Sequence, residues 1–317
     1  MTEGSGRGEP TAIRPGRFAD DFARFGPHSD QTLSLADSQA YARDLARSHY
    51  ENFPVLTRLM PAAMRQPIAD VYAFSRWADD LGDEVDDPKR SLELLAWWRS
   101  LLDDGIAGKA RHPVFVALRE TIGNCGLDRQ PFADLISAFE QDQTKTRYDS
   151  LAELVDYSSR SANPVGRLVL AIAGHLDDRN AADSDAICTG LQLANFWQDV
   201  ARDWAIGRRY LPADAMATHG ATDATIAFGR TTPQLRATLR DLVADAESRL
   251  QVGRDLSRRL PGRVGLTVEL FRQGGLAICR RIRSQDFAVL ESRPKVTKGD
   301  AVRGLGAAML SRVRRRR

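Results

Sequence analysis

The chain of 317 residues is 43% hydrophobic, which is enough apolar sequence for the core of one large domain or two small ones. Its 45 basic and 42 acidic residues leave a net charge of +3, and this balance argues against a nucleic-acid partner, which requires a concentrated basic face. The three cysteines are far apart and odd in number, so we expect no disulfide framework and a reducing, cytoplasmic location. No apolar run has the length of a membrane span or the pattern of a signal peptide.

The two ends of the chain differ in composition from its middle. Residues 1–30 are rich in Gly, Pro and charge, which predicts a flexible N-terminal tail. Residues 31–300 show apolar residues at helical spacing without a linker, which predicts a single all-α domain. Residues 301–317 form a basic C-terminal tail, which is either a solvated terminus or a peripheral contact with anionic lipid at the inner face of the membrane. Helices are predicted at residues 35–49, 64–85, 91–104, 112–123, 130–141, 151–158, 163–175, 183–205, 233–259 and 264–290.

The helix predicted at residues 64–85 carries the first informative motif. Tyr72, Arg76, Asp79 and Asp83 fall within an arc of roughly 60° on a helical wheel. The opposite side of this helix is apolar and can pack against the core. One face therefore presents two carboxylates one turn apart, with an arginine just before them. The apolar side comprises Val71, Phe74, Ala78, Leu81 and Val85.

The helix predicted at residues 183–205 repeats this arrangement. Gln192, Asn195, Asp199 and Asp203 share an arc of roughly 80°. A basic, aromatic turn follows directly, and it consists of Gly207, Arg208, Arg209, Tyr210, Leu211 and Pro212.

Carboxylates four residues apart repel each other in an isolated helix by a few tenths of a kcal/mol. A divalent cation between them reverses this effect, and Mg²⁺ prefers oxygen ligands from carboxylates and phosphates. Two such helices facing each other could hold several Mg²⁺ ions around a diphosphate, next to a dry cavity for a reactive cation. A solvated acidic face explains most single motifs of this kind, but two motifs with accompanying Arg, Gln and Asn residues favour a catalytic site.

At these residues the sequence resembles the squalene/phytoene synthase family over roughly residues 35–300. The first motif matches the family pattern Y-x-x-x-R-x-x-D-x-x-x-D, and the second matches Q-x-x-N-x-x-x-D-x-x-x-D followed by G-R-x-Y-L-P. The resemblance implies an all-α prenyl synthase fold around a central cavity, and a prenyl diphosphate as the substrate. It also implies that the metal ligands are Asp79, Asp83, Asn195, Asp199 and Asp203.

The resemblance implies further site residues. Tyr157 matches a tyrosine linked to handling of the cation, and Asp142 precedes it as the family expects. His49 and Phe53 match residues that contact the diphosphate or line the cavity. The other implied substrate-binding residues are Tyr72, Arg76, Gln192, Asn195, Arg208 and Tyr210.

Several departures from the common family pattern resemble the HpnC-type hydroxysqualene synthases of hopanoid biosynthesis. Gln198 replaces an arginine that usually precedes the second-motif aspartate, and Gly274-Gly275 stands where a cavity tyrosine is often found. This branch converts presqualene diphosphate to hydroxysqualene without NADPH. A neutral amide can position a water molecule, whereas an arginine offers only donors, so we expect Gln198 to contribute to formation of the alcohol. The segments that carry the resemblance are H-Y-E-N-F-P-V, S-A-N-P-V-G and N-F-W-Q-D-V.

Two alternative functions stay open at the level of sequence. The first is head-to-head condensation of two farnesyl diphosphates to presqualene diphosphate, squalene or a phytoene-type product. The second is a non-catalytic carrier of prenyl lipids, although a carrier has no need to align repelling carboxylates. Other enzymes of the hopanoid pathway are candidate partners, in addition to the prenyl diphosphate and the anionic membrane surface.

Overall fold

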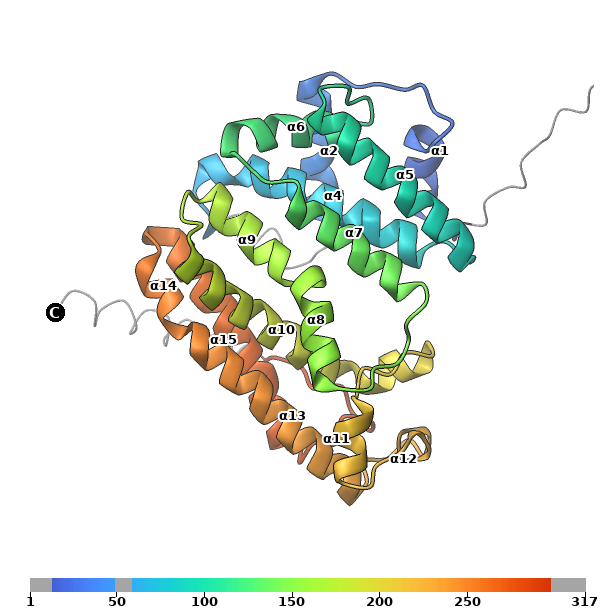
Figure 1. The fold of residues 1–317 in the computed structure, drawn as a ribbon, viewed down its shortest axis with the longest axis vertical. Helices are drawn as coiled ribbons and strands as arrows, with labels where there is room; N and C mark the ends of the chain where they lie inside the picture. The colour runs from blue at the N-terminus through green and yellow to red at the C-terminus, as the bar shows by residue number, and fades with distance from the viewer. Residues whose placement is uncertain (1–12, 49–58, 298–317) are drawn as a thin grey trace, which may run out of the picture.

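The computed structural model of the chain describes residues 13–48 and 59–297 (Figure 1). Within these ranges the backbone forms helices and no β-strand, which confirms the predicted all-α fold. The helices are α1 (Arg17–Phe25), α2 (Leu35–Ser48), η1 (Ala62–Met64), α4 (Arg65–Asp83), α5 (Pro88–Ile106), α6 (Pro113–Cys125), α7 (Gln130–Asp142), α8 (Leu151–Ser161), α9 (Asn163–Ile172), α10 (Asp178–Ala205), α11 (Ala213–Thr218), α12 (Asp223–Ala227), α13 (Pro233–Val252), η2 (Gly253–Asp255), α14 (Leu256–Arg259) and α15 (Gly262–Ser284).

The hydrophobic core has two main parts. In the N-terminal part, α2 and α4 to α7 pack around large aromatic side chains, among which Trp77 and Trp98 stack with ring centroids 5.3 Å apart. In the C-terminal part, α13 and α15 pack along α10, and Trp197 is fully buried there. Helices α8 and α9 lie between these two groups (Figure 1). The two motif helices, α4 and α10, therefore each belong to a different part of the core.

The expectation of a flexible tail over residues 1–30 is wrong from residue 17 onward. Residues 17–25 form α1, and its Phe18 and Phe25 are buried. Phe18 packs edge-on against Trp77 at 5.3 Å between ring centroids, and Phe25 packs in the same way against Tyr41 at 5.3 Å. The aromatic residues of this segment supply enough apolar burial to fix a short helix despite the polar composition around it.

Most of the predicted helices are confirmed, but two in the C-terminal half end earlier than expected. The helix predicted at 233–259 gives way after Val252 to a 3-10 turn, and Gly253 of this turn lies against α10 where a Cβ would meet Ile187. The helix predicted at 264–290 ends at Ser284, since Asp286 and Phe287 adopt positive φ angles of 51° and 60°. These left-handed residues turn the chain back toward α10, and this turn matters for the site described below.

None of the described helices combines the length and the hydrophobicity that crossing a membrane requires. Residues 301–317, which carry the predicted basic tail, lie outside the described residues. The predicted contacts with a membrane surface and with other pathway enzymes stay predictions.

Candidate active site

The first motif lies on the C-terminal half of α4. The predicted apolar face is confirmed, because Phe74, Ala78 and Leu81 are fully buried. Arg76 pairs with two carboxylates of its own helix: its Nη1 lies 2.9 Å from Oδ2 of Asp79, and its Nε donates to Oδ2 of Asp80 at 3.0 Å. Asp80 is buried, whereas Asp79 is partly exposed and Asp83 is exposed. The outward face of α4 thus presents Asp79 and Asp83, as the wheel predicts.

Burial and the neighbouring charge of Asp83 raise the pKa of Asp79 to about 6, although Arg76 and Arg208 act in the opposite direction. A pKa well above the ordinary value means that the negative charge of this carboxylate is incompletely compensated. A cation bound between Asp79 and Asp83 would offset the repulsion between the two carboxylates.

The second motif lies on α10, which begins after the N-cap Asp177 because its carboxylate accepts a hydrogen bond from the backbone N–H of Asn180. Burial, and then the charge of Asp199 one turn earlier, raises the pKa of Asp203 to about 7. The carboxylates of α10 therefore show the same electrostatic conflict as those of α4.

Arg208 joins the two motif helices. It follows the end of α10, and its Nη2 donates to Oδ1 of Asp83 on α4 at 3.3 Å. Its charge also lowers the pKa values of Asp79, Asp142 and Asp203 relative to what burial alone would give. One cation thus acts on carboxylates from both motifs, which places the two aspartate faces on a common site.

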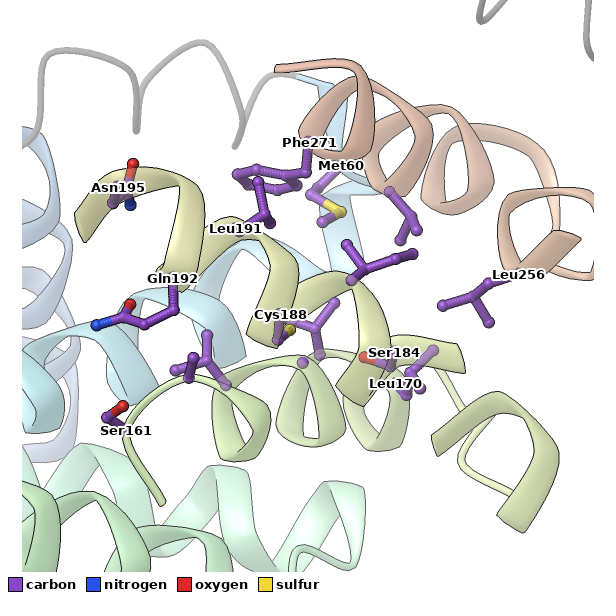
Figure 2. Close-up of a pocket in the computed structure, with 16 residues that line it drawn as sticks. Met60, Ser161, Leu170, Ser184, Cys188, Leu191, Gln192, Asn195, Leu256 and Phe271 are labelled. Carbon is purple, nitrogen blue, oxygen red and sulfur yellow. The ribbon is translucent and has the colours of Figure 1, made fainter. Parts of the chain in front are cut away.

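An apolar cavity of about 320 Å³ adjoins this site (Figure 2). Gln192 and Asn195 of the second motif lie at one end of the cavity, and Leu170 and Leu256 lie at the other. Its walls come from α8, α9, α10, α14 and α15 and are mostly aliphatic or aromatic. Such a cavity can hold a hydrocarbon chain whose polar head lies next to the aspartates.

A smaller apolar cavity of about 180 Å³ lies between α4 and α9. Tyr72 of the first motif lines it, and Val165 and Val169 of α9 line both cavities. Each motif helix therefore borders apolar space through a residue that the sequence analysis selected for substrate binding.

An aromatic cluster lies beside Arg208. The Tyr157 hydroxyl donates to Oδ2 of Asp142 at 2.7 Å, and the rings of Phe196 and Tyr210 stack with centroids 3.9 Å apart. Burial, followed by the charge of Asp142, raises the pKa of Tyr157 well above its ordinary value, so the phenol stays neutral and acts as a donor. Burial likewise raises the pKa of Asp142 to about 6. Tyr157 contacts this cluster and is not among the residues that line the two apolar cavities.

Gln198 makes contacts that the sequence does not reveal. Its side chain is buried, its Nε2 donates to the carbonyl of Pro294 at 2.5 Å, and its Oε1 accepts from Arg293 at 3.4 Å. Arg293 in turn pairs with Asp199, with its Nε 2.5 Å from Oδ1 and its Nη2 3.0 Å from Oδ2. Arg293 is not among the predicted site residues, because one arginine before a proline carries no motif signal. The prediction that Gln198 positions a water molecule stays a prediction.

The two carboxylate pairs suit a metal ion that is shared with a substrate. Among residues 13–48 and 59–297, no three His, Cys, Asp or Glu side chains are grouped closely enough to hold a metal ion by themselves. Each motif does supply hard oxygen donors whose charges repel one another. Mg²⁺ commonly takes one or two carboxylates and completes its coordination with phosphate oxygens and water, so the donor set fits this ion.

The structure brings together most of the site residues that the sequence predicted. These residues lie on α4, on α8, on α10 or in the turn after α10, and contacts or cavity walls connect them: Tyr72, Arg76, Asp79, Asp83, Tyr157, Gln192, Asn195, Gln198, Asp199, Asp203, Arg208 and Tyr210. His49 and Phe53 lie outside the described residues.

Comparisons with known proteins agree with this geometry. The all-α architecture is that of isoprenoid synthases, and the crystal structure of squalene synthase HpnC from Alicyclobacillus acidocaldarius shares it. It superimposes with a TM-score of 0.77 at 42% identity, covering 80% of this chain and 96% of that one. The squalene/phytoene synthase family matches residues 46–300, so the chain belongs to this family, whose members act on prenyl diphosphates.

Two curated relatives show the range of activities within the family. A hydroxysqualene synthase from Rhodopseudomonas palustris is 34% identical over 240 residues, covering 74% of this chain and 80% of the relative. A phytoene synthase from Arthrospira platensis is 34% identical over 218 residues, covering 65% of this chain and 71% of the relative. Family membership therefore leaves the specific reaction to be argued from the site.

Proposed function

We propose that this chain ionises presqualene diphosphate and captures the resulting cation with water, which gives hydroxysqualene and free diphosphate without NADPH. The observation that carries the proposal is the apolar cavity that ends at Gln192 and Asn195, which precede Asp199 and Asp203 on the same helix. The similarity to hydroxysqualene synthases and to the HpnC structure supports this choice of reaction.

In the proposed reaction the carbon–oxygen bond to diphosphate breaks, and the leaving group takes the electron pair. The positive charge of Arg208 can balance the negative charge that grows on the departing diphosphate. Arg208 reaches Asp83 of α4 from the turn after α10, and it is itself partly buried. The apolar walls of the cavity keep bulk water from the cation until it has rearranged. One water molecule then forms the new carbon–oxygen bond and loses its proton to the released diphosphate.

The proposal includes Mg²⁺ as the cofactor. Several ions bound with the diphosphate would supply the positive charge that stabilises it as it leaves. The residues that would hold them are Asp79, Asp83, Asn195, Asp199 and Asp203. Arg76 fixes Asp79 through their ion pair, and this contact limits the rotamers of one proposed ligand.

The neutral Tyr157 hydroxyl, held by Asp142, would keep its ring in the aromatic cluster next to Arg208. An aromatic face attracts positive charge, so this ring would act on a cation of the substrate from the aromatic cluster beside Arg208 and not from the wall of either apolar cavity. Phe196 and Tyr210 pack against it and limit its movement.

A second candidate function is condensation of two farnesyl diphosphates, which the similarity to a phytoene synthase favours. The test is product analysis by mass spectrometry after incubation of the purified chain with Mg²⁺ and one of the two diphosphates, without NADPH. Hydroxysqualene from presqualene diphosphate, with farnesyl diphosphate unchanged, is the expected result. Consumption of farnesyl diphosphate would show that the chain catalyses condensation. Inertness to both substrates would instead support a carrier.

A further inference from the structure

The segment that follows α15 folds back onto the second motif helix. Phe287 and Val289 of this segment are buried in the C-terminal part of the core. The backbone N–H and the hydroxyl of Thr231 both donate to the carboxylate of Glu291, each at 2.8 Å. Arg236 donates to the carbonyl of Asp286 at 3.0 Å. These contacts fix the backbone just before Arg293. The fold therefore determines where the side chain of Arg293 begins.

Arg293 and Asp199 form a two-point ion pair. Both nitrogens of the guanidinium fork contact the carboxylate, one on each oxygen, at 2.5 and 3.0 Å. A fork of this kind constrains direction as well as distance, which a single charge contact does not. Arg202 on α10 provides a contrast, because its Nη1 lies 3.8 Å from Oδ1 of Asp199 and its side chain is 69% exposed.

Gln198 connects the segment to α10. Its side chain is 6% exposed, and its amide meets a carbonyl acceptor and a guanidinium donor at the same time. An amide, with a donor and an acceptor on one rigid group, satisfies Pro294 and Arg293 together. An arginine at this position could still donate to the Pro294 carbonyl, but it would place a second positive charge against Arg293.

We propose that Gln198 is a positioning residue that holds Arg293 against Asp199, so that this carboxylate is paired with the arginine until a divalent cation displaces it. Asp199 then changes partner when the metal enters, and the guanidinium is left beside the site where diphosphate would bind. The inference rests on the proposed function only in taking Asp199 as a metal ligand. In this proposal Gln198 acts by holding Arg293, and not by contacting a water molecule itself.

The test is direct binding of Mn²⁺, measured by electron paramagnetic resonance on the full chain without substrate. In Arg293→Gln, Asp199 loses its competing partner, and Mn²⁺ should bind about three- to tenfold more tightly than in the unchanged chain. Arg202→Gln removes the same charge near the same carboxylate without removing the fork, and it should change the affinity by less than about twofold. Equal Mn²⁺ binding by Arg293→Gln and Arg202→Gln, including no binding by either, would overturn the proposal.

A double-mutant cycle tests the part played by Gln198. Gln198→Met keeps the side-chain volume but removes both hydrogen bonds, and it should tighten Mn²⁺ binding about two- to threefold. In the Arg293→Gln background the same substitution should have no further effect, because the residue through which it acts is gone. An equal effect in both backgrounds would refute positioning through Arg293. These results do not depend on the product formed, so a chain that fails to make hydroxysqualene can still confirm or overturn the ion-pair exchange.

Discussion

Helices α4 and α10 each present two aspartates four residues apart, but the arginines that pair with them come from different places. On α4, Arg76 lies on the same helix and reaches Asp79 and Asp80 three and four residues later. On α10, the fork around Asp199 comes from Arg293, 94 residues away in the sequence. The close counter-charge of Asp79 and Asp80 therefore comes from their own helix, whereas the two-point partner of Asp199 arrives only after the C-terminal half has folded.

The two helices also differ in what they bury. Helix α4 buries the carboxylates of Asp70 and Asp80. The buried residues of α10 include no acidic side chain, and this helix instead packs closely against neighbouring glycines. A Cβ on Gly275 of α15 would approach Leu191 of α10 to 2.8 Å. Stability should therefore depend on charge around α4 and on shape around α10, and the substitutions below separate these two effects.

The largest expected effect is on activity, and it should be equal for the two helices. Asp79→Asn and Asp199→Asn should each lower kcat for the proposed reaction by about 10²–10³-fold, since each removes one proposed metal ligand. Steady-state release of diphosphate measures this loss. Asp178→Asn is the matched control, because Asp178 is exposed in the first turn of α10. A variant of either motif that keeps more than a tenth of the activity would contradict a shared metal site.

The loss of stability on removing an arginine should differ between the two helices. Arg76→Met leaves the buried Asp80 without its partner and should lower the free energy of unfolding by about 2–4 kcal/mol. Arg293→Met breaks a more exposed pair and should cost less than about 1 kcal/mol. Urea unfolding measures both values. Adding Asp80→Asn to Arg76→Met should recover part of the stability, and equal losses for the two arginines would remove the distinction between a local and a distant counter-charge.

Close packing around α10 is tested by two neighbouring glycines on α15. Gly275→Ala should lower the free energy of unfolding by about 1–3 kcal/mol, because the new methyl group would clash with Leu191 and Leu250. Gly274→Ala meets no atom within 4 Å and should stabilise the helix by up to about 1 kcal/mol. Thermal unfolding of the two variants gives the comparison. If Gly275→Ala matched Gly274→Ala, the close approach of α15 to α10 would be wrong.

The smallest expected effect concerns pH and the buried charge of α4. Burial raises the pKa of Asp70 from 3.8 to about 6, although Thr121 and Gln66 donate hydrogen bonds to its carboxylate. Between these two pH values the folded chain keeps a proton that the unfolded chain has lost, so this group makes stability fall as the pH rises. Relative to Asp70→Asn, the unchanged chain should lose about 2 kcal/mol between pH 4 and pH 7.

Urea unfolding of both proteins across this pH range provides the measurement for Asp70. The difference in their free energies of unfolding should change through the window and become constant above about pH 7. A difference that stays constant from pH 4 to pH 7 would show that Asp70 is ionised with an ordinary pKa in the folded chain.

The sequence by itself determined the helical fold and the two aspartate faces. Helical periodicity acts over a few residues, so the spacing of Tyr72, Arg76, Asp79 and Asp83 was sufficient to place them on one side of α4. The same local rule predicted Gln192, Asn195 and Asp199 on α10, where Gln192 and Asn195 line the apolar cavity. It failed for α1, because the burial of Phe18 and Phe25 depends on residues far along the chain.

Only the tertiary structure decided which charges meet. Arg208 and Asp83 are 125 residues apart, and Arg293 and Asp199 are 94 residues apart, so no local pattern could pair them. The proposed positioning role of Gln198 could not be predicted either, because its amide contacts the carbonyl of Pro294 and the guanidinium of Arg293, which are distant in the sequence. Side-chain spacing within a helix follows from its pitch, but contacts between distant segments depend on how the whole core packs.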